Sequence, residues 1–423
     1  MNSIALQNES SGLSALELRD AVRRSLVGRG PMKKVLLIPP DITRLNSGAG
    51  ILAAMYFEEL EPQCRVELLP ALGSHVPMTR EEQISFFGPQ IPQDRFLVHN
   101  WRTGVVKLGE VPREFVHRVS DGLIDEAIDV ELSDIVVNGG WDLIISIGQV
   151  VPHEVVGMSN YSKNLFVGCG GNSMINKSHM LGAFYGAERV MGRDHSPVRR
   201  VFDYAEQNFI GDLPLMYALT VTSQIDGRTA INGLYIGRSR SLFEQAVALS
   251  QKLNICFVEK PIDTCVVWMD PEEFRSTWLS NKAVYRSRMA LNAGARLIVL
   301  APGVDKFGED PENDRLIRKF GYCGREKVLE LCKTEPELAA NLSVAAHLIH
   351  GSSDGKFSIT YAAPKLGREQ VESVCFQYGD FDALMRLYDP EKLVEGWNTM
   401  PGGEEIYFIK NPALGLWALR SQF

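Results

Sequence analysis

Apolar and polar positions follow two alternating patterns through the first half of the chain. Residues 34–38, 65–70 and 142–148 are short, nearly continuous apolar runs, which are typical of strands buried on both faces of a parallel sheet. Residues 96–99 and 134–137 are shorter runs of the same kind, and we expect strands there too. Because segments with helical spacing separate several of these runs, the pattern predicts a doubly wound α/β sheet.

Helix-start signals occur in the segments between the expected strands. Ser14 with Glu17 and Thr79 with Glu82 have the spacing of capping boxes, in which a hydroxyl and a carboxylate satisfy free amide groups at a helix start. Further helices are expected over residues 51–60 and 180–191.

The strand pattern restarts in the second half of the chain. We expect strands over residues 264–269, 297–301 and 374–378, and a helix that begins at Asp270. The prediction is therefore two Rossmann-like α/β domains with the active site in the crevice between them. Residues 1–262 would form the catalytic domain and 263–405 the second, smaller domain, while 406–423 would pack back on the first domain.

Composition narrows the class of protein. The chain has 423 residues, of which 45% are hydrophobic and 23% charged, which is ordinary for a folded globular protein. A net charge of -8 argues against nucleic-acid and anionic-membrane partners, and no apolar run reaches the length of a membrane span. Seven cysteines without a CxxC pair and no secretory signal predict a cytoplasmic protein with reduced thiols.

Reactive side chains follow three of the expected strands. In a doubly wound sheet, the carboxyl ends of the strands meet in one crevice, where ligands bind. An arginine there can bind a carboxylate or phosphate, two imidazoles can transfer protons near neutral pH, and a desolvated lysine can act as a nucleophile. The candidates are Asp41, Thr43 and Arg44 after the first strand, His75 after the second, and His153, Lys163 and His179 after the third.

A glycine cluster lies inside the third group. Gly168, Gly170 and Gly171 would let backbone amides approach a phosphate, although they spell neither a Walker loop nor GxGxxG. Signatures of zinc proteases (HExxH) and serine hydrolases (GxSxG) are absent. Taken singly, each histidine or lysine is also compatible with a structural or solvated residue, so the argument depends on their combination.

The order and spacing of these motifs resemble the lactate racemase family of nickel-pincer enzymes over nearly the whole chain. That family has Asp-x-Thr-Arg after its first strand, as at Asp41–Arg44, and Gly-x-His followed by Pro-Met-Thr, as at residues 73–79. It also has a histidine ten residues before a lysine and another sixteen residues after it, as at His153, Lys163 and His179.

The resemblance implies a cofactor and a role for each residue. The cofactor would be a nickel-pincer nucleotide, pyridinium-3,5-bisthiocarboxylic acid mononucleotide nickel, attached covalently to Lys163, with His179 as the protein ligand of the metal. His75 and His153 would be the acid/base groups, and Arg44 would bind the substrate carboxylate. Asp41, Thr43 and the glycines at 168, 170 and 171 would contact the cofactor or orient the site.

The implied reaction is the racemisation or epimerisation of a 2-hydroxy acid. Its C2 carbon would be inverted by hydride transfer to the cofactor, coupled to proton transfer at the hydroxyl, with a bound 2-keto acid as intermediate. The implied partners are the small-molecule substrate and the biosynthesis proteins that supply the nickel cofactor.

Two departures from the family concern the substrate and the lysine. Asn160-Tyr161-Ser162 stands where the family is rich in glycine. In the second domain the family has Tyr-Gln-x-x-Lys, with the lysine on the substrate carboxylate, whereas this chain has Tyr285-Arg286-Ser287-Arg288-Met289. Tyr285, Arg286 and Arg288 are the candidate substrate-binding residues there. These extra basic groups favour a larger or more polar hydroxy acid than lactate, such as a dicarboxylic hydroxy acid or a sugar acid.

Two other functions remain open from the sequence. A protein of the same fold could bind the nickel cofactor or a phosphorylated ligand without turnover. Alternatively, His75, His153 and His179 could hold zinc in a metal-dependent hydrolase or lyase.

Overall fold

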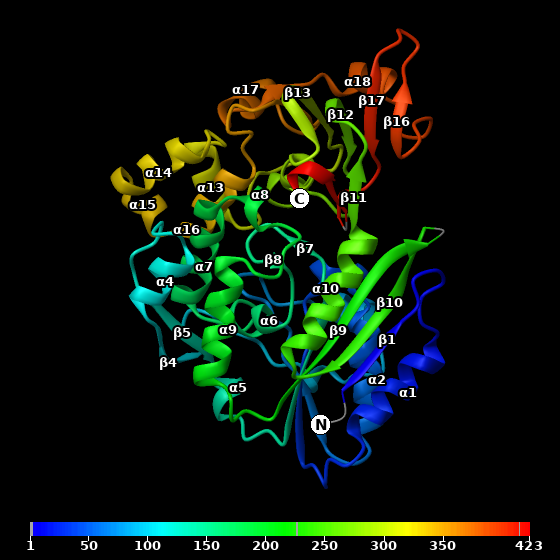
Figure 1. Cartoon of the computed structure of the whole chain (residues 1–423), viewed down its shortest axis with the longest axis vertical. Helices are drawn as coiled ribbons and strands as arrows, with labels where there is room; N and C mark the ends of the chain where they lie inside the picture. The colour runs from blue at the N-terminus through cyan, green and yellow to red at the C-terminus, as the bar shows by residue number, and fades with distance from the viewer. Residues whose placement is uncertain (1–2, 226, 414) are drawn as a thin grey trace. The chain divides into compact units, whose positions relative to one another are not determined.

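The computed structural model describes residues 3–225, 227–413 and 415–423, which divide into two compact units (Figure 1). Unit 1 comprises Met1–Leu181 and Val190–Asn254, and unit 2 comprises Gly182–Arg189 and Ile255–Phe423. The mixed α/β architecture predicted from the apolar runs is confirmed. Its division falls after Asn254, where the prediction placed it after residue 262.

Unit 1 is built on a six-stranded sheet in the order β1-β10-β9-β6-β2-β3. The strands β9, β6, β2 and β3 run parallel, and β10 and β1 add antiparallel pairs at one edge. Their bounds are β1 Ile4–Gln7, β2 Lys34–Ile38, β3 Arg65–Leu68, β6 Leu143–Gln149, β9 Leu215–Ile225 and β10 Arg228–Gly237. The three main apolar runs of the sequence are thus β3, β2 and β6, side by side.

Helices and two small strand pairs complete unit 1. The strand pairs are β4 Val105–Val111 with β5 Ile128–Ser133, and β7 Pro152–His153 with β8 Gly157–Met158. The helices are α1 Ala15–Leu26, α2 Ala49–Leu60, α3 Arg80–Phe87, α4 Arg113–Val119, α5 Asp134–Asn138, α6 Ser162–Phe166, α7 Asn172–Tyr185, α9 Pro197–Phe209 and α10 Arg240–Asn254, with short 3-10 helices η1 Ile42–Ser47 and η2 Gln93–Arg95. Both predicted capping boxes form, at the starts of α1 and α3.

The central strands are buried on both faces, which explains why they read as continuous apolar runs. Val35 and Leu37 of β2 belong to the core cluster that includes α1 and α2, whereas Leu36 and Ile38 belong to the cluster that includes α9 and α10. Successive side chains of a strand point to opposite faces, so both faces must be apolar. Polar side chains that could form a site therefore follow the ends of these strands.

Unit 2 has its own six-stranded sheet, in the order β15-β14-β13-β12-β17-β16, and a separate pair, β11 with β18. Only β16 is antiparallel to its neighbour in the large sheet. The strands are β11 Ile255–Val258, β12 Ile262–Trp268, β13 Leu291–Leu300, β14 Ser358–Ala362, β15 Gln377–Tyr378, β16 Gly396–Thr399, β17 Glu405–Ile409 and β18 Leu416–Leu419. The helices are α8 Ala187–Val190, α11 Thr277–Ser280, α12 Lys282–Ser287, α13 Pro311–Phe320, α14 Arg325–Thr334, α15 Pro336–Ala339, α16 Leu342–His350, α17 Arg368–Ser373 and α18 Phe381–Leu387, with η3 Arg420–Gln422.

Three elements predicted before residue 192 need correction. Residues 134–137 are not a strand but lie in the helix α5, which follows β5 directly and is held by a bond from Asn138 to the Asp134 carboxylate. Residues 96–99 form only a single bridge, from Phe96 to Leu68. The helix expected over 180–191 begins earlier, as α7, and is interrupted at Gly186, whose φ of 100° suits glycine.

Three predictions for unit 2 are also wrong. Residues 406–423 do not return to the first domain, because β17 pairs with β12 and β18 pairs with β11. Asp270 caps a turn, not a helix: its carboxylate accepts the Glu272 amide at 2.8 Å. The strand expected over 374–378 shortens to β15, since Cys375 has a φ of 69°.

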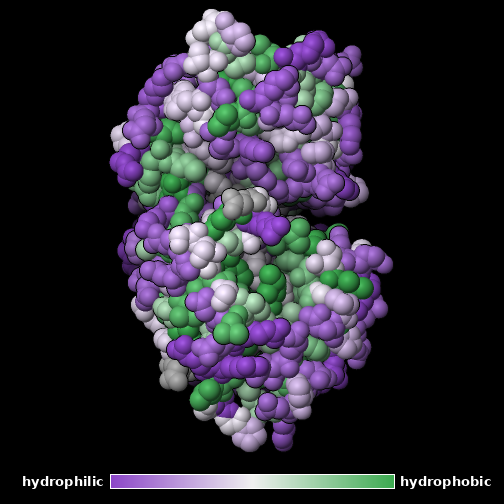
Figure 2. Space-filling model, turned by 90° about the vertical axis from the view of Figure 1, so that its right-hand side faces the viewer, coloured by the Kyte–Doolittle hydropathy of each residue, from purple (hydrophilic) through white to green (hydrophobic). Residues whose placement is uncertain are grey.

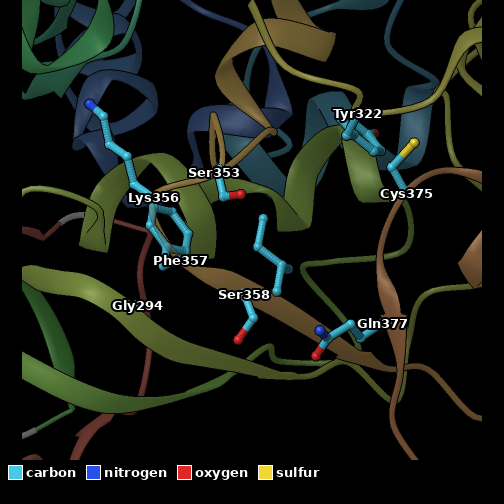
Figure 3. A pocket seen from close by; sticks show the side chains of 10 residues that line it. Gly294, Tyr322, Ser353, Lys356, Phe357, Ser358, Cys375 and Gln377 are labelled. Carbon is cyan, nitrogen blue, oxygen red and sulfur yellow. The ribbon is translucent and has the colours of Figure 1, made fainter.

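A cavity of about 420 Å³ lies in unit 2 (Figure 3). It is found at the amino-terminal ends of β13, β14 and β15, whereas open α/β sheets bind ligands at the carboxyl ends of their strands. The Nζ of Lys356 points away from it in Figure 3 and pairs with Glu188 at 3.0 Å. None of the predicted site residues lines this cavity.

The surface of the chain mixes polar and apolar residues. Figure 2 shows hydrophilic residues over much of the displayed face, with smaller hydrophobic areas between them. Among the described residues, no helix is both long and apolar enough to cross a membrane.

Candidate active site

The predicted residues of unit 1 follow three neighbouring parallel strands. Asp41 comes after β2, His75 after β3, and His153 after β6, in the short strand β7. Because β2 lies between β3 and β6, these three carboxyl ends share one edge of the sheet. The contact between His75 and Asp41, 2.6 Å from Nδ1 to Oδ2, shows that the first two ends meet.

Asp41 is a buried carboxylate that fixes two neighbours. Its Oδ1 caps η1 by accepting the Thr43 amide at 3.2 Å and the Thr43 hydroxyl at 2.5 Å. Burial alone would raise the pKa of Asp41, but the charge and hydrogen bond of His75, together with the Thr43 hydrogen bond and the Arg44 charge, lower the pKa to about 2. Since an ionised carboxylate only accepts, the Nδ1 of His75 donates, and in the neutral ring its Nε2 carries the lone pair.

His153 has the opposite arrangement. Its Nδ1 accepts the backbone amide of Val155 at 3.1 Å, so in the neutral ring the proton is on Nε2. Burial lowers the pKa of His153 well below its ordinary value, and the Lys163 and Arg44 charges add to this. His153 therefore presents a neutral N–H, whereas His75 presents a lone pair.

Glu154 is a site residue that the sequence reasoning missed. Its Oε2 lies 3.6 Å from the Nδ1 of His153, and its charge raises the pKa values of His153, Lys163 and His179. The Nδ1 lone pair already faces the Val155 amide, so the Glu154 carboxylate acts on neutral His153 by charge and not by a hydrogen bond. The only signal in the sequence was its position next to His153.

Lys163 lies in the short helix α6 and is partly exposed. The next residue, Asn164, anchors this helix, because its amide donates to the Ile38 carbonyl of β2 and the Ser146 hydroxyl of β6, both at 3.0 Å. Desolvation and the Arg44 charge lower the pKa of Lys163 to about 8. A substantial fraction of the amine is therefore neutral near pH 8, which is the nucleophilic form.

His179 is oriented as metal-binding histidines are. Its Nδ1 lies 2.6 Å from the Ile175 carbonyl, an acceptor only, so Nδ1 carries the proton and Nε2 the lone pair. Burial lowers the pKa of His179 to about 4, so the ring is neutral at physiological pH. Among the described residues, no group of three or more His, Cys, Asp or Glu side chains is placed to hold a metal ion. The described part of the chain therefore does not bring His75, His153 and His179 together as a zinc site.

Arg44 supplies a cation to the same site. It lies in η1, at a kink where its φ and ψ are −114° and 40°, and it is partly exposed. Its charge contributes to the lowered pKa values of Lys163, His153 and Asp41. The position and exposure of Arg44 are compatible with binding an anionic group of a ligand.

The predicted glycines lie where the backbone is crowded. A Cβ at Gly170 would approach the Phe166 carbonyl oxygen to 1.8 Å, and one at Gly171 would approach the Glu131 carboxylate to 2.4 Å. Glu131 also accepts the Ser173 amide at 2.9 Å, near the start of α7, which occupies a group that a phosphate would need. Tight packing, which also holds for Gly168, explains these glycines, and their contact with a nucleotide stays a prediction.

The predicted residues of unit 2 are buried. Tyr285 and Arg286 belong to α12, and the Nη1 of Arg286 donates to the Gly415 carbonyl at 3.0 Å. The guanidinium of Arg288 bonds to Glu188 at 2.9 Å and to Asp354 at 3.2 Å, and its side chain is 2% exposed. Arg288 thus stabilises the interior of unit 2. Substrate binding by these three residues stays a prediction.

The comparisons with known proteins agree with the motifs. Residues 20–192 match the family model of the lactate racemase N-terminal domain. Among solved structures, a protein from Thermotoga maritima is similar with a TM-score of 0.85 and 22% identity, over 98% of this chain and 100% of that one. The lactate racemase apoprotein from Thermoanaerobacterium thermosaccharolyticum is similar with a TM-score of 0.69 and 17% identity, over 96% of this chain and 93% of that one. No curated protein matches the chain.

Proposed function

We propose that this chain is a racemase or epimerase that inverts C2 of a 2-hydroxy acid, starting from the match of residues 20–192 to the family model of the lactate racemase N-terminal domain. The observation that carries the proposal is the pair of histidines held in opposite tautomers, His75 with a lone pair on Nε2 and His153 with a proton there. An enzyme that acts at one carbinol needs both an acceptor and a donor for the hydroxyl proton.

A lysine-tethered nickel-pincer nucleotide fits the residues present. Lys163 provides a desolvated amine for a covalent bond, and His179 provides one neutral imidazole whose Nε2 is available to the metal. Such a cofactor, when bound, would supply a reversible hydride acceptor for the C2 hydrogen. With most metal donors on the cofactor, the protein would need to supply only one ligand, the role that we propose for His179.

The chain's own residues would handle the rest of the substrate. The Nε2 of His75 takes the hydroxyl proton of one enantiomer, and the Nε2–H of His153 donates a hydrogen bond to the same oxygen as it becomes a carbonyl. When hydride returns to the other face of C2, His75 gives the same proton back to the oxygen, so neither histidine has to change its tautomer. Arg44 binds the carboxylate, and the buried Asp41 keeps His75 in the tautomer that accepts a proton.

We further propose that the substrate is larger or more polar than lactate. The support is the sequence Tyr285-Arg286-Ser287-Arg288-Met289, in which the substrate-binding lysine of the family's Tyr-Gln-x-x-Lys is missing, so the substrate clamp differs from that for lactate. A dicarboxylic hydroxy acid or a sugar acid is the class that we would test first.

The experiment is an intact mass spectrum, with metal analysis, of the protein purified from a host that makes the cofactor. We expect an added mass on Lys163, mapped by peptide analysis, and one nickel per chain. Lys163→Arg should remove both, whereas Lys252→Arg, at an exposed helix position, should keep both. An unmodified wild-type chain without nickel would overturn the cofactor assignment.

A hydroxy-acid panel then tests turnover. The loaded protein should lower the enantiomeric or epimeric purity of at least one 2-hydroxy acid, with the first candidates being dicarboxylic and sugar acids. Loading with nickel but no change in any hydroxy acid would favour a non-catalytic cofactor-binding protein.

A further inference from the structure

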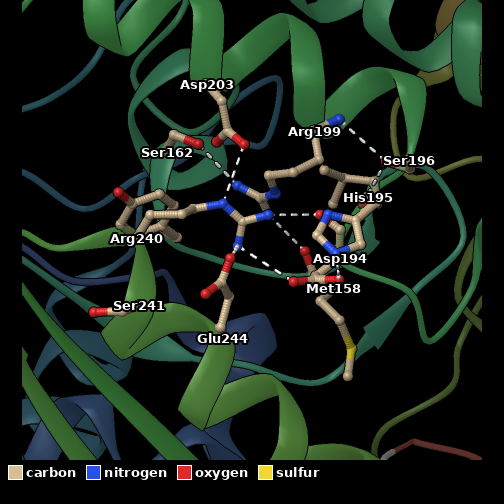
Figure 4. A network of polar contacts seen from close by, with 12 residues as sticks. Met158, Ser162, Asp194, His195, Ser196, Arg199, Asp203, Arg240, Ser241 and Glu244 are labelled. Carbon is tan, nitrogen blue, oxygen red and sulfur yellow. Dashed lines mark hydrogen bonds and ion pairs between the residues drawn. The ribbon is translucent and has the colours of Figure 1, made fainter. Parts of the chain in front are cut away.

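A fully buried arginine lies beneath the segment that leads to Lys163. Arg199, in α9, donates from Nη1 to the Ser162 hydroxyl at 2.8 Å, and from Nη2 to the carbonyls of Met158 at 2.7 Å and Asn160 at 3.1 Å. Its exposed fraction is 0%. Figure 4 shows its guanidinium pointing into the space between Ser162 and Met158. One planar group thus binds three oxygens of the segment that precedes the lysine.

That segment has an unfavourable backbone. Asn160 and Tyr161 both have positive φ, 59° and 56°, which side chains other than glycine rarely adopt. Tyr161 is also the N-cap of α6, and its side chain makes no cap hydrogen bond. A strained conformation of this kind persists only where the surroundings determine it from several sides. A five-residue helix such as α6 supplies little stability of its own.

The side chains of the segment are held by packing, and its carbonyls by Arg199. The Tyr161 ring stacks on Phe243, with centroids 4.9 Å apart, and contacts Tyr217 at 4.3 Å. Arg199 lies over the Phe243 ring as well, at 4.6 Å. The aromatic rings fix where the segment lies, and the guanidinium fixes the direction of its peptide groups.

The charge of Arg199 is costly where it is. Burial lowers its pKa to about 10, and the nearby carboxylates Asp194 and Asp203 are bonded by Arg240 at 3.4 Å and 3.2 Å. Figure 4 shows Arg240 between those two carboxylates. A buried charge without its own ion pair contributes little to the free energy of folding. The contribution of Arg199 therefore lies in the backbone geometry that it imposes on this segment.

We propose that Arg199 is a positioning residue that holds α6 so that the Lys163 amine points correctly for attachment of the cofactor. This inference rests on the proposed function, because it assumes that the cofactor becomes attached to Lys163. An arginine is required because its fork reaches three oxygens at once, which a lysine cannot do.

The test measures the reactivity of Lys163 in the unloaded protein. Wild type, Arg199→Lys and Arg199→Met are acetylated with limiting acetic anhydride from pH 6 to 10, and the Lys163 peptide is quantified by mass spectrometry. The matched controls are Arg200→Lys and Arg200→Met, at the exposed neighbouring position of α9. Cofactor loading is measured on the same variants by intact mass after expression in the cofactor-competent host.

We expect Arg199→Lys to change the acetylation rate of the fully deprotonated Lys163 amine at least threefold and to lower cofactor loading at least tenfold. The pH at which acetylation of Lys163 is half-maximal should stay nearly unchanged. In Arg199→Met the midpoint should also rise, because a positive charge near the amine is lost. The charges that remain around Lys163 are Arg44, Glu154 and Asp41. Both Arg200 variants should behave as wild type. Ser162→Ala, which removes only one acceptor, should give a smaller loss of loading and serves if the Arg199 variants do not fold.

Wild-type acetylation and loading in folded Arg199→Lys would overturn the proposal, as would equal losses in the Arg200 variants. If Arg199→Lys does not fold, wild-type loading and acetylation in Ser162→Ala would overturn it. If the wild-type chain carries no adduct, the proposed function fails. The acetylation rates then still decide whether Arg199 orients the lysine.

Discussion

The two candidate acid/base histidines have opposite settings within one site. His75 lies on an exposed loop, with a side chain 37% exposed, and depends on a charged partner from another strand end, Asp41. His153 is buried, and its Nδ1 is bonded by the amide of Val155, two residues away in its own chain segment. A long-range contact sets one tautomer and a local backbone contact sets the other. Two histidines in one candidate site can therefore have different roles. The tautomer of His75 is the easier of the two to disrupt by mutation, because it depends on a side chain from another strand end.

The largest expected effect follows from removing the charged partner of His75. In Asp41→Asn the Nδ1 of His75 loses an acceptor-only partner, so the ring can adopt the wrong tautomer. By analogy with other imidazole–carboxylate pairs, kcat/KM should fall by about 10³–10⁴-fold. The measurement is turnover of the hydroxy acid identified in the panel, with equal loading of cofactor verified by mass.

Nitrogen NMR of the unloaded protein provides the control. Histidine ring ¹⁵N shifts should show wild-type His75 protonated on Nδ1 and His153 on Nε2, and Asp41→Asn should alter only His75. Activity within tenfold of wild type, or the same tautomer at both histidines, would break the comparison.

The second effect is on stability. The pKa of Asp41 is about 2 in the folded protein and near its ordinary value when unfolded, so its ionised form favours the folded state. This difference is worth about 2 kcal/mol above pH 4 and is lost as the pH falls from 4 toward 2. Urea unfolding at pH 7 and at pH 3 should show the Asp41→Asn variant less stable at pH 7, with a smaller gap at pH 3. A gap that stays constant would exclude the proton linkage.

A smaller effect is expected at the partner of His153. Glu154→Gln removes a charge 3.6 Å from Nδ1 but leaves the Val155 amide in place, so the tautomer of His153 should persist. We expect a three- to tenfold change in kcat/KM, on the order of 1 kcal/mol. A thousandfold loss would mean that Glu154 is itself a proton carrier, and the distinction between the two histidines would have to be redrawn.

The smallest expected effect concerns the protonation of His153, which should not change over the pH range measured. Because burial lowers the pKa of His153 well below its ordinary value, its ring should stay neutral as the pH falls from 8 through 6.5, the ordinary pKa of histidine. Its ¹⁵N shifts in the unloaded protein should therefore be flat over this range. A titration near pH 6.5 would contradict the buried setting of His153.

The sequence predicted those parts of the molecule that depend on local pattern. The runs that became β2, β3 and β6 were evident because a strand buried on both faces must be apolar throughout. Since polar residues then collect at strand ends, the positions of Asp41, His75 and His153 followed. The spacing of His153, Lys163 and His179 agreed with the family that residues 20–192 match.

Other parts were decided by packing that no short window contains. Ile135–Val137 is as apolar as a strand, but β5 ends directly before it and the chain turns into α5. The roles of Glu154 and Arg199 depend on groups from other elements, and the tautomers of the histidines depend on single hydrogen bonds. These features require three-dimensional contacts.

In unit 1, the segment that matches the family model is shorter than the segment that folds together. The family match ends at residue 192, yet β6, whose seven residues are all buried, is paired along its far side by β9, Leu215–Ile225. A fragment cut at residues 20 and 192 would expose the edge of β6 and would lack members of both apolar clusters, such as Phe202 and Phe243 of one and Ile4 and Leu234 of the other. Such an open, hydrophobic edge invites aggregation. A gene fragment meant to carry this candidate site should therefore extend to Asn254, where unit 1 ends.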